Sequence, residues 1–181
     1  TLIVPFFVLA FYLPGFYGDL TALILFLIAS FTDFLDGMLA RLLGEESKLG
    51  ELLDPIADKI IVAAALILLV MDGTIRSYEV IAAIIILTRE ILVSGLREFL
   101  AEGKIKLPVS NLAKLKTVLQ MVSIALLLSG ETGNKIINFQ DYNAQTIGIV
   151  LLWLSAALTL FTGYEYMRKG IDHAISEDNK D

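Results

Sequence analysis

The chain alternates between long apolar segments and short polar ones. Six segments are apolar over most of their length, at residues 1–16, 20–43, 52–71, 78–100, 109–129 and 144–167. Because about 20 helical residues cross the ~30 Å hydrocarbon core of a bilayer, segments of this length predict membrane-spanning helices. Pro14-Gly15 ends the first segment and Asp72-Gly73 follows the third. Pro55 is expected in the first turn of the third helix, where its missing N–H costs nothing.

The composition agrees with a membrane protein. Hydrophobic residues make up 56% of the 181 residues, and the mean hydropathy is +0.74, whereas soluble domains are about 45–50% apolar. We predict an all-α integral membrane protein with six transmembrane helices, a membrane domain at residues 1–170 and a solvated cytoplasmic tail at 171–181. The absence of cysteine excludes disulfides and thiol chemistry, and the net charge of −6 does not by itself indicate a partner.

The basic residues predict the orientation of the helices. Only Arg76 and Lys135 fall on one side of the predicted bundle. The remainder of the 14 Lys and Arg residues fall on the other side, at Arg41, Lys48, Lys59, Arg89, Arg97, Lys104, Lys106, Lys114, Lys116, Arg168, Lys169 and Lys180. The positive-inside rule places this basic side in the cytoplasm.

Four aspartates lie on the same cytoplasmic side, at the ends of apolar segments. Asp33 and Asp36 are spaced i,i+3, and Asp54 and Asp58 are spaced i,i+4, so each pair projects from one face of a helix. An ionised carboxylate at mid-bilayer costs about 2.5–3.5 kcal/mol. Two such charges about 4 Å apart repel by a further ~4 kcal/mol at an effective dielectric constant of about 20. Four converging carboxylates therefore predict a bound cation.

Divalent cations fit this arrangement best. Mg²⁺ binds carboxylates together with substrate phosphates, and two metals ~4 Å apart can clamp the attacking and leaving oxygens of a phosphoryl displacement. If the second and third helices pack antiparallel, their aspartates converge at the cytoplasmic end. The small residues Gly37 and Ala40 would let a ligand approach the backbone there, and Arg41 is suited to bidentate contact with phosphate.

These residues form one continuous pattern: Asp33-x2-Asp36-Gly37-x2-Ala40-Arg41-x8-Gly50-x3-Asp54-x3-Asp58. The pattern resembles the complete signature of the CDP-alcohol phosphatidyltransferase family. The stretches VPFFVLAFYLP at 4–14 and TREILVSGLREFLAEGKIKLPVSNLAKLKTVLQM at 88–121 resemble the phosphatidylglycerophosphate synthase branch of that family.

The resemblance implies a catalytic role for each aspartate. Asp33, Asp36 and Asp54 would hold two divalent cations, Mg²⁺ or Mn²⁺. Asp58 would be the general base that deprotonates the acceptor alcohol, and it would also be able to contact a metal. The acceptor oxygen would then attack the phosphate that bears the diacylglycerol, and CMP would leave.

The resemblance also implies the substrates and the setting. The site for the donor, CDP-diacylglycerol, would be lined by Asp36, Gly37, Ala40, Arg41 and Gly50, with Arg41 on the diphosphate. An acceptor of glycerol 3-phosphate would give phosphatidylglycerophosphate. We expect a homodimer in the bacterial inner (cytoplasmic) membrane, in contact with membrane lipids and with no nucleic-acid partner. Members of this branch carry a polar, amphipathic N-terminal arm, which we expect to be missing from this chain.

The phosphate of the acceptor needs a basic pocket of its own. Arg89 lies roughly 16 Å before the end of its apolar segment at about 1.5 Å per residue, too deep for easy contact with the interface. A buried arginine in a membrane segment is a candidate functional residue. We predict that Arg89 and Lys116 bind the acceptor phosphate, with Arg97 and Lys114 behind them.

Other interpretations of these residues are open at this stage. The aspartates could be paired structural charges or helix caps, and Gly37 and Ala40 could serve close helix packing. Arg89 could neutralise Glu90 or Glu98. Arg41, Lys104, Lys106 and Lys114 could instead serve only to fix the orientation of the helices in the membrane, as cytoplasmic basic residues do.

Alternatives also exist for the function as a whole. A divalent-cation transporter or channel would also place aspartates in a membrane, but the outer halves of the second and third segments offer few polar residues for a path. Within the enzyme class, inositol phosphate, serine or a second phosphatidylglycerol could replace glycerol 3-phosphate as acceptor. The motif indicates the donor more firmly than the acceptor.

Overall fold

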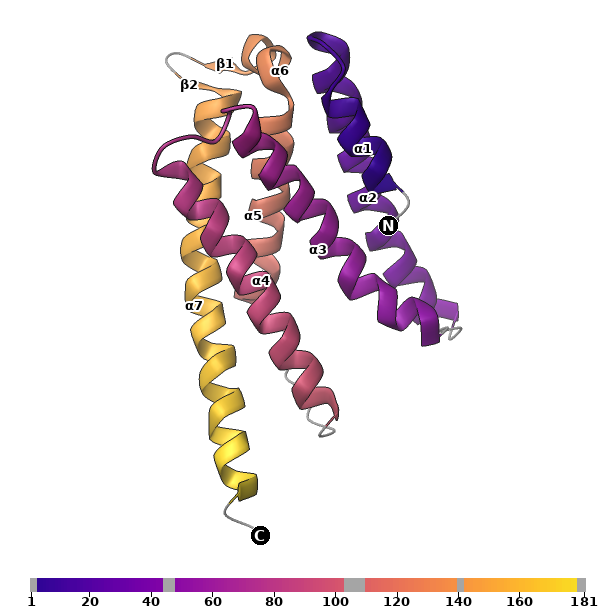
Figure 1. Cartoon of the computed structure of the whole chain (residues 1–181), viewed down its shortest axis with the longest axis vertical. Coiled ribbons are helices and arrows are strands. Elements are labelled where there is room, and N and C mark those ends of the chain that lie inside the picture. The colour runs from indigo at the N-terminus through magenta and orange to yellow at the C-terminus, as the bar shows by residue number, and fades with distance from the viewer. Residues whose placement is uncertain (1–2, 44–47, 103–109, 140–141, 179–181) are drawn as a thin grey trace.

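A computed structural model describes residues 3–43, 48–102, 110–139 and 142–178. Side chains at 33–43, 48–58, 101–102, 138–139, 142, 169 and 172–178 lie outside this description. The described chain is helical except for one short hairpin (Figure 1), with elements α1 (Ile3–Phe11), α2 (Phe16–Leu43), α3 (Lys48–Met71), α4 (Glu79–Glu102), α5 (Asn111–Leu128), α6 (Gly130–Ile136), β1 (Asn138–Phe139), β2 (Tyr142–Asn143) and α7 (Ala144–Asp178). Each of the six predicted apolar segments forms a helix, which confirms the all-helical class.

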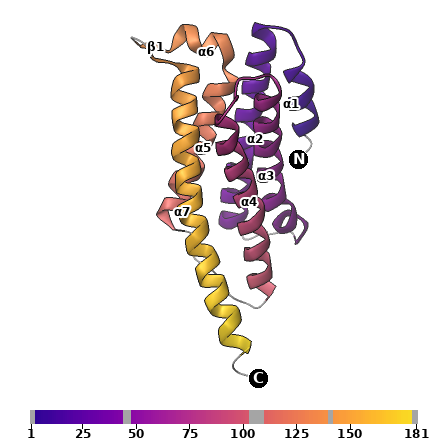
Figure 2. The same ribbon diagram turned by 60° about the vertical axis from the view of Figure 1, so that its left-hand side comes forward.

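The helices pack as a bundle in which successive long helices run in opposite directions. α7 packs against α5 and α4, while α3 contacts α1, α2, α4 and α5. The C-terminal ends of α2, α4 and α7 lie at the same end of the bundle as the N-terminal ends of α3 and α5 (Figures 1 and 2). The most deeply buried large side chains include Phe7, Phe26, Leu66, Ile86, Ile124 and Leu152. The helix directions thus alternate along the bundle, and the membrane orientation predicted from the basic residues stays a prediction.

Turns and caps set the helix ends. Gly15 and Gly73 have positive φ values of 63° and 80° in the turns after α1 and α3, a conformation that glycine adopts without strain. The Ser110 Oγ accepts a hydrogen bond of 3.2 Å from the backbone N–H of Ala113 and so caps α5. The first-turn position predicted for Pro55 is wrong, because α3 begins at Lys48 and Pro55 lies inside the helix.

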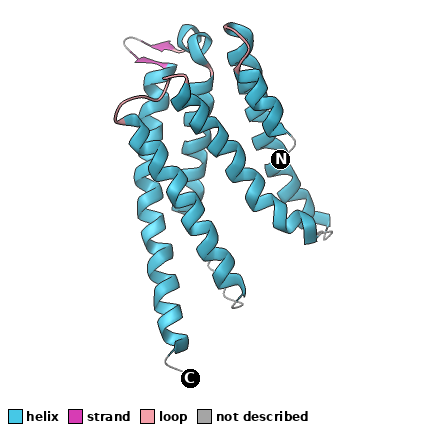
Figure 3. Ribbon diagram, in the orientation of Figure 1, coloured by secondary structure: helices cyan, strands magenta, loops and turns pink. Residues whose placement is uncertain are grey.

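The segment 130–143, predicted as a polar loop, contains the short helix α6 and the antiparallel hairpin of β1 and β2 (Figure 3). Asn143 then caps α7, because its Oδ1 accepts hydrogen bonds of 2.9 Å and 3.0 Å from the backbone N–H and the hydroxyl of Thr146. At its other end α7 continues to Asp178. The predicted division between residues 170 and 171 falls within this helix and stays a prediction.

Two of the described helices are long and apolar enough to cross a membrane, namely α5 and the part of α7 from Ala144 to Arg168. Shorter apolar stretches occupy Phe16–Thr32 and Lys59–Met71. Large apolar side chains cover much of the outer surface, with Ile91 70% and Phe6 64% exposed. Such a surface suits a lipid surrounding, since soluble monomers seldom expose extended apolar patches.

Close packing of α5 against α7 gives a test of the fold. A methyl group added at Gly148 would lie 2.9 Å from Leu127 Cδ2, and the Ser123 hydroxyl donates a hydrogen bond of 2.7 Å to the Gly148 carbonyl. Overpacking costs about 1–3 kcal/mol, so Gly148→Ala is expected to lower the Tm in detergent despite its gain in helix propensity. Gly95→Ala is the control, because no atom lies within 4 Å of that added methyl. Equal shifts in Tm for the two variants would contradict this packing.

Candidate active site

The family-like signature lies on two neighbouring helix ends. Its first half, Asp33 to Arg41, falls in the last turns of α2, and its second half, Gly50 to Asp58, falls in the first turns of α3. The two helices contact each other and run in opposite directions (Figure 1). The backbone therefore brings both halves to the end of the bundle predicted to be cytoplasmic.

The side chains of the signature lie outside the described residues. This applies to all of its positions, namely Asp33, Asp36, Gly37, Ala40, Arg41, Gly50, Asp54 and Asp58. Among the side chains that are described, no group of three or more His, Cys, Asp or Glu could hold a metal. The metal ligands, the general base and the CDP-binding residues stay predictions. A set of aspartate oxygens nevertheless fits Mg²⁺ or Mn²⁺, which prefer carboxylate and phosphate ligands.

The structure brings together the two residues predicted to bind the acceptor phosphate. Arg89 of α4 and Lys116 of α5 meet at one carboxylate oxygen of Glu90: the Lys116 Nζ donates to Glu90 Oε1, and the Arg89 Nη1 lies 3.6 Å from the same atom. All three side chains are largely buried, with 5%, 11% and 18% exposed for Lys116, Arg89 and Glu90 respectively. The alternative pairing of Arg89 with Glu90 is therefore also present in the structure.

The Arg89 guanidinium also contacts two side chains of α7. Its Nη2 donates a hydrogen bond of 3.0 Å to Thr162 Oγ1, and the guanidinium lies 5.7 Å from the centre of the Tyr166 ring in a cation–π contact. Gly163 leaves room for the arginine, since a methyl group there would lie 3.1 Å from Arg89 Cγ. Sequence reasoning missed Thr162 and Tyr166. Their only signal is their helical spacing within an apolar segment.

Further polar side chains are buried between α5 and α7. The Ser155 hydroxyl donates a hydrogen bond of 3.4 Å to the backbone carbonyl of Lys116. In the described part of the chain, three buried atoms have no hydrogen-bond partner: Arg89 Nε, Gln120 Oε1 and Thr159 Oγ1. Buried polar atoms are nearly always paired with protein, water or ligand. The surroundings of Arg89 and Lys116 thus have unused capacity for a polar ligand.

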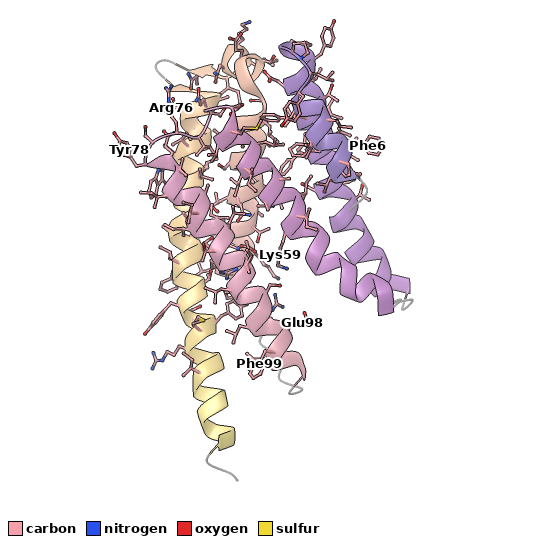
Figure 4. All side chains as sticks on the ribbon, in the orientation of Figure 1. Phe6, Lys59, Arg76, Tyr78, Glu98 and Phe99 are labelled. Atoms are coloured by element: carbon pink, nitrogen blue, oxygen red, sulfur yellow. The ribbon has the colours of Figure 1, made fainter. Side chains whose placement is uncertain are left out.

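The structure does not bring Arg97 and Lys114 into direct contact with this cluster among the described ion pairs. Both are exposed, and among the described ion pairs neither contacts Glu90. Arg97 is close enough to Arg89 for electrostatic repulsion, and Lys59 of α3 is similarly close to Lys116. Figure 4 shows Lys59 between α3 and α4. Lys59 directly follows Asp58 in the chain, so the cluster is within electrostatic reach of the residue next to the signature.

Comparison with known proteins places these features in a family. The sequence profile of the CDP-alcohol phosphatidyltransferase family matches residues 1–161. The chain is 40% identical over 167 residues to a CDP-diacylglycerol–glycerol-3-phosphate 3-phosphatidyltransferase of Rickettsia felis, covering 92% of this chain and 88% of the relative. It is 38% identical over 191 residues to a protein of the same name from Cereibacter sphaeroides, covering 89% and 86%. The chain belongs to the CDP-alcohol phosphatidyltransferase family.

Proposed function

We propose that this protein transfers the phosphatidyl group of CDP-diacylglycerol to glycerol 3-phosphate, giving phosphatidylglycerophosphate and CMP. The observation that carries the choice of acceptor is the buried pair of cations Arg89 and Lys116, which meet at one oxygen of Glu90. The names of the relatives from Rickettsia felis and Cereibacter sphaeroides support the same reaction. The family is one of transferases, so cation transport is not retained.

The aspartates of α2 and α3 would carry the chemistry. Asp33, Asp36 and Asp54 would hold two divalent cations, Mg²⁺ or Mn²⁺, with Asp58 within reach of the same site. When bound, the cations would neutralise the negative charge that develops on the transferred phosphate and on the leaving CMP. Asp58 would remove the proton from the acceptor hydroxyl. The hydroxyl oxygen would then attack the phosphate that bears the diacylglycerol.

Donor and acceptor would be bound by different parts of the bundle. Gly37, Ala40 and Gly50 would give the CDP group access to the backbone of α2 and α3, and Arg41 would bind the diphosphate. Arg89 and Lys116 would bind the phosphate of the acceptor and direct its free hydroxyl toward Asp58. Because these two cations are buried, their attraction for a phosphate is screened less than at a surface.

The setting proposed for this reaction is a bacterial inner membrane. The helices of the six apolar segments, α1 to α5 and α7, would lie in it, with the signature at the cytosolic end, where CDP and glycerol 3-phosphate are accessible. The exposed apolar surface supports a membrane setting, and the twelve-to-two distribution of basic residues supports this orientation. We further propose that the protein is a homodimer.

The acceptor site yields a prediction about kinetics. Arg89→Ala and Lys116→Ala are each expected to raise the acceptor KM about 10- to 150-fold, the equivalent of about 1.5–3 kcal/mol for a charge-assisted hydrogen bond. The donor KM should change little. Arg89→Lys should recover only part of the loss, because an ammonium group cannot reproduce the guanidinium fork. Saturation curves for both substrates measure these effects.

The exposed Arg168 of α7 provides the matched control, since Arg168→Ala removes the same charge away from the cluster and should leave both curves unchanged. Unphosphorylated glycerol should be a poor acceptor for the native protein, because the buried cations would gain no partner. Normal acceptor KM values in both alanine variants, or equal use of glycerol and glycerol 3-phosphate, would show that Arg89 and Lys116 do not bind the acceptor.

A further inference from the structure

Glu90 has a position that the proposed reaction does not explain. It lies between the two cations assigned to the acceptor phosphate, and it is the residue that both of them contact. We propose that Glu90 is an internal counter-ion, which holds the place of the acceptor phosphate in the empty site and thereby sets the affinity of that site for phosphorylated acceptors. This inference rests on the proposed function and deepens it.

The contacts of Glu90 resemble those that a phosphate would make. A single oxygen, Oε1, accepts from Lys116 Nζ and lies 3.6 Å from Arg89 Nη1. A phosphate oxygen between the same two nitrogens would find the same donors. A buried charge without a partner is strongly destabilising, and the Lys116 residue is only 4% exposed. An empty site therefore needs an anion at this position, and Glu90 supplies it.

The charges explain why a carboxylate rather than a neutral group would be useful here. In their ionised forms Arg89, Lys116 and Glu90 together carry one net positive charge, and Lys59 and Arg97 add positive potential from nearby. An acceptor phosphate must compete with Glu90 for Lys116, which weakens its binding. The product carries the same phosphate, so the return of Glu90 to Lys116 would also favour product release. Glu90 would thus be a positioning residue that limits affinity.

Replacement of Glu90 by an uncharged isostere tests this role. Glu90→Gln retains an oxygen that can accept from Lys116 but removes the competing charge. We expect the KM for glycerol 3-phosphate to fall about tenfold, the equivalent of about 1.4 kcal/mol, while the donor KM stays within about twofold. A purely structural role would lower the Tm without lowering the acceptor KM. With unphosphorylated glycerol, the variant should show no gain over the native protein.

Two further variants complete the test. Glu98→Gln is the matched control, because Glu98 lies on the same helix and is exposed, and it should not change the acceptor KM. Glu90→Asp keeps the charge but withdraws it by one methylene from Lys116, so its acceptor KM should fall between those of the native protein and Glu90→Gln. If Glu90→Gln does not fold, Glu90→Asp decides the question: a lower acceptor KM supports the role of Glu90, and an unchanged or higher one contradicts it.

The outcomes separate this inference from the proposed function. A native protein that releases no CMP with glycerol 3-phosphate would overturn the proposed function, and the role of Glu90 with it. An active native protein with an unchanged or raised acceptor KM in the Glu90 variants would overturn the role of Glu90 alone. A lowered KM that extends equally to glycerol would also contradict it, because the effect would not depend on the acceptor's charge.

Discussion

Replacement of Asp33, Asp36 or Asp54 by Asn is expected to abolish CMP release in each case. Asn keeps the size of the side chain but loses the negative charge that a hard divalent cation requires. Loss of an outer-shell partner of a metal ligand typically costs about 10–100-fold in metal affinity or activity, and loss of a ligand itself should cost more. Activity of each purified variant, measured as CMP release from CDP-diacylglycerol, provides the test.

Chelation provides an independent check on the same site. Excess chelator should stop turnover by the native protein, and added Mg²⁺ or Mn²⁺ should restore it. Asp72→Asn is the matched control, because Asp72 lies in the turn after α3, where it accepts a hydrogen bond of 2.8 Å from the backbone of Thr74. The turn between α3 and α4 lies at the end of the bundle opposite the C-terminal end of α2 (Figure 1). Undiminished CMP release in excess chelator would rule out the two-metal mechanism.

Asp58→Asn is expected to reduce kcat by about 10²–10⁴-fold, the usual loss when a general base is removed. If Asp58 acts mainly as the base, the variant should bind the metal and CDP-diacylglycerol with nearly native affinity, because Asp33, Asp36 and Asp54 remain. Binding of the donor in the presence of Mg²⁺ distinguishes the two roles. A loss of donor affinity as severe as that of Asp33→Asn would identify Asp58 as an essential metal ligand instead.

The long helices could be predicted from the sequence because their apolar length leaves few alternatives. The smaller elements could not be predicted in this way. Within the segment 130–143, helix α6 and the hairpin of β1 and β2 are short and polar, so neither carries a clear periodic pattern. The start of α3 is predicted too late for a related reason: its first turn, KLGE from Lys48, contains two charged residues and a glycine and so does not read as part of the apolar segment.

The candidate site divides in the same way. Arg89 and Lys116 could be grouped from the sequence, because Arg89 lies deep in an apolar segment and the phosphate of an acceptor needs a basic pocket on the same side of the bundle. The contacts of Arg89 with Thr162 and Tyr166 depend on how α4 packs against α7, across more than 70 residues of sequence, and no local pattern encodes that packing. The contact of Lys116 with Glu90 likewise depends on tertiary packing, across 26 residues of sequence.

One assay addresses the central claim most directly. Purified protein is supplied with CDP-diacylglycerol, Mg²⁺ and, in separate reactions, glycerol 3-phosphate, glycerol, serine, inositol phosphate or phosphatidylglycerol, and the release of CMP and the lipid product are both measured. We expect rapid CMP release with glycerol 3-phosphate, with phosphatidylglycerophosphate as the product, and little release with the other acceptors. Equal or faster release with another acceptor, or no release with glycerol 3-phosphate, would contradict the proposed function.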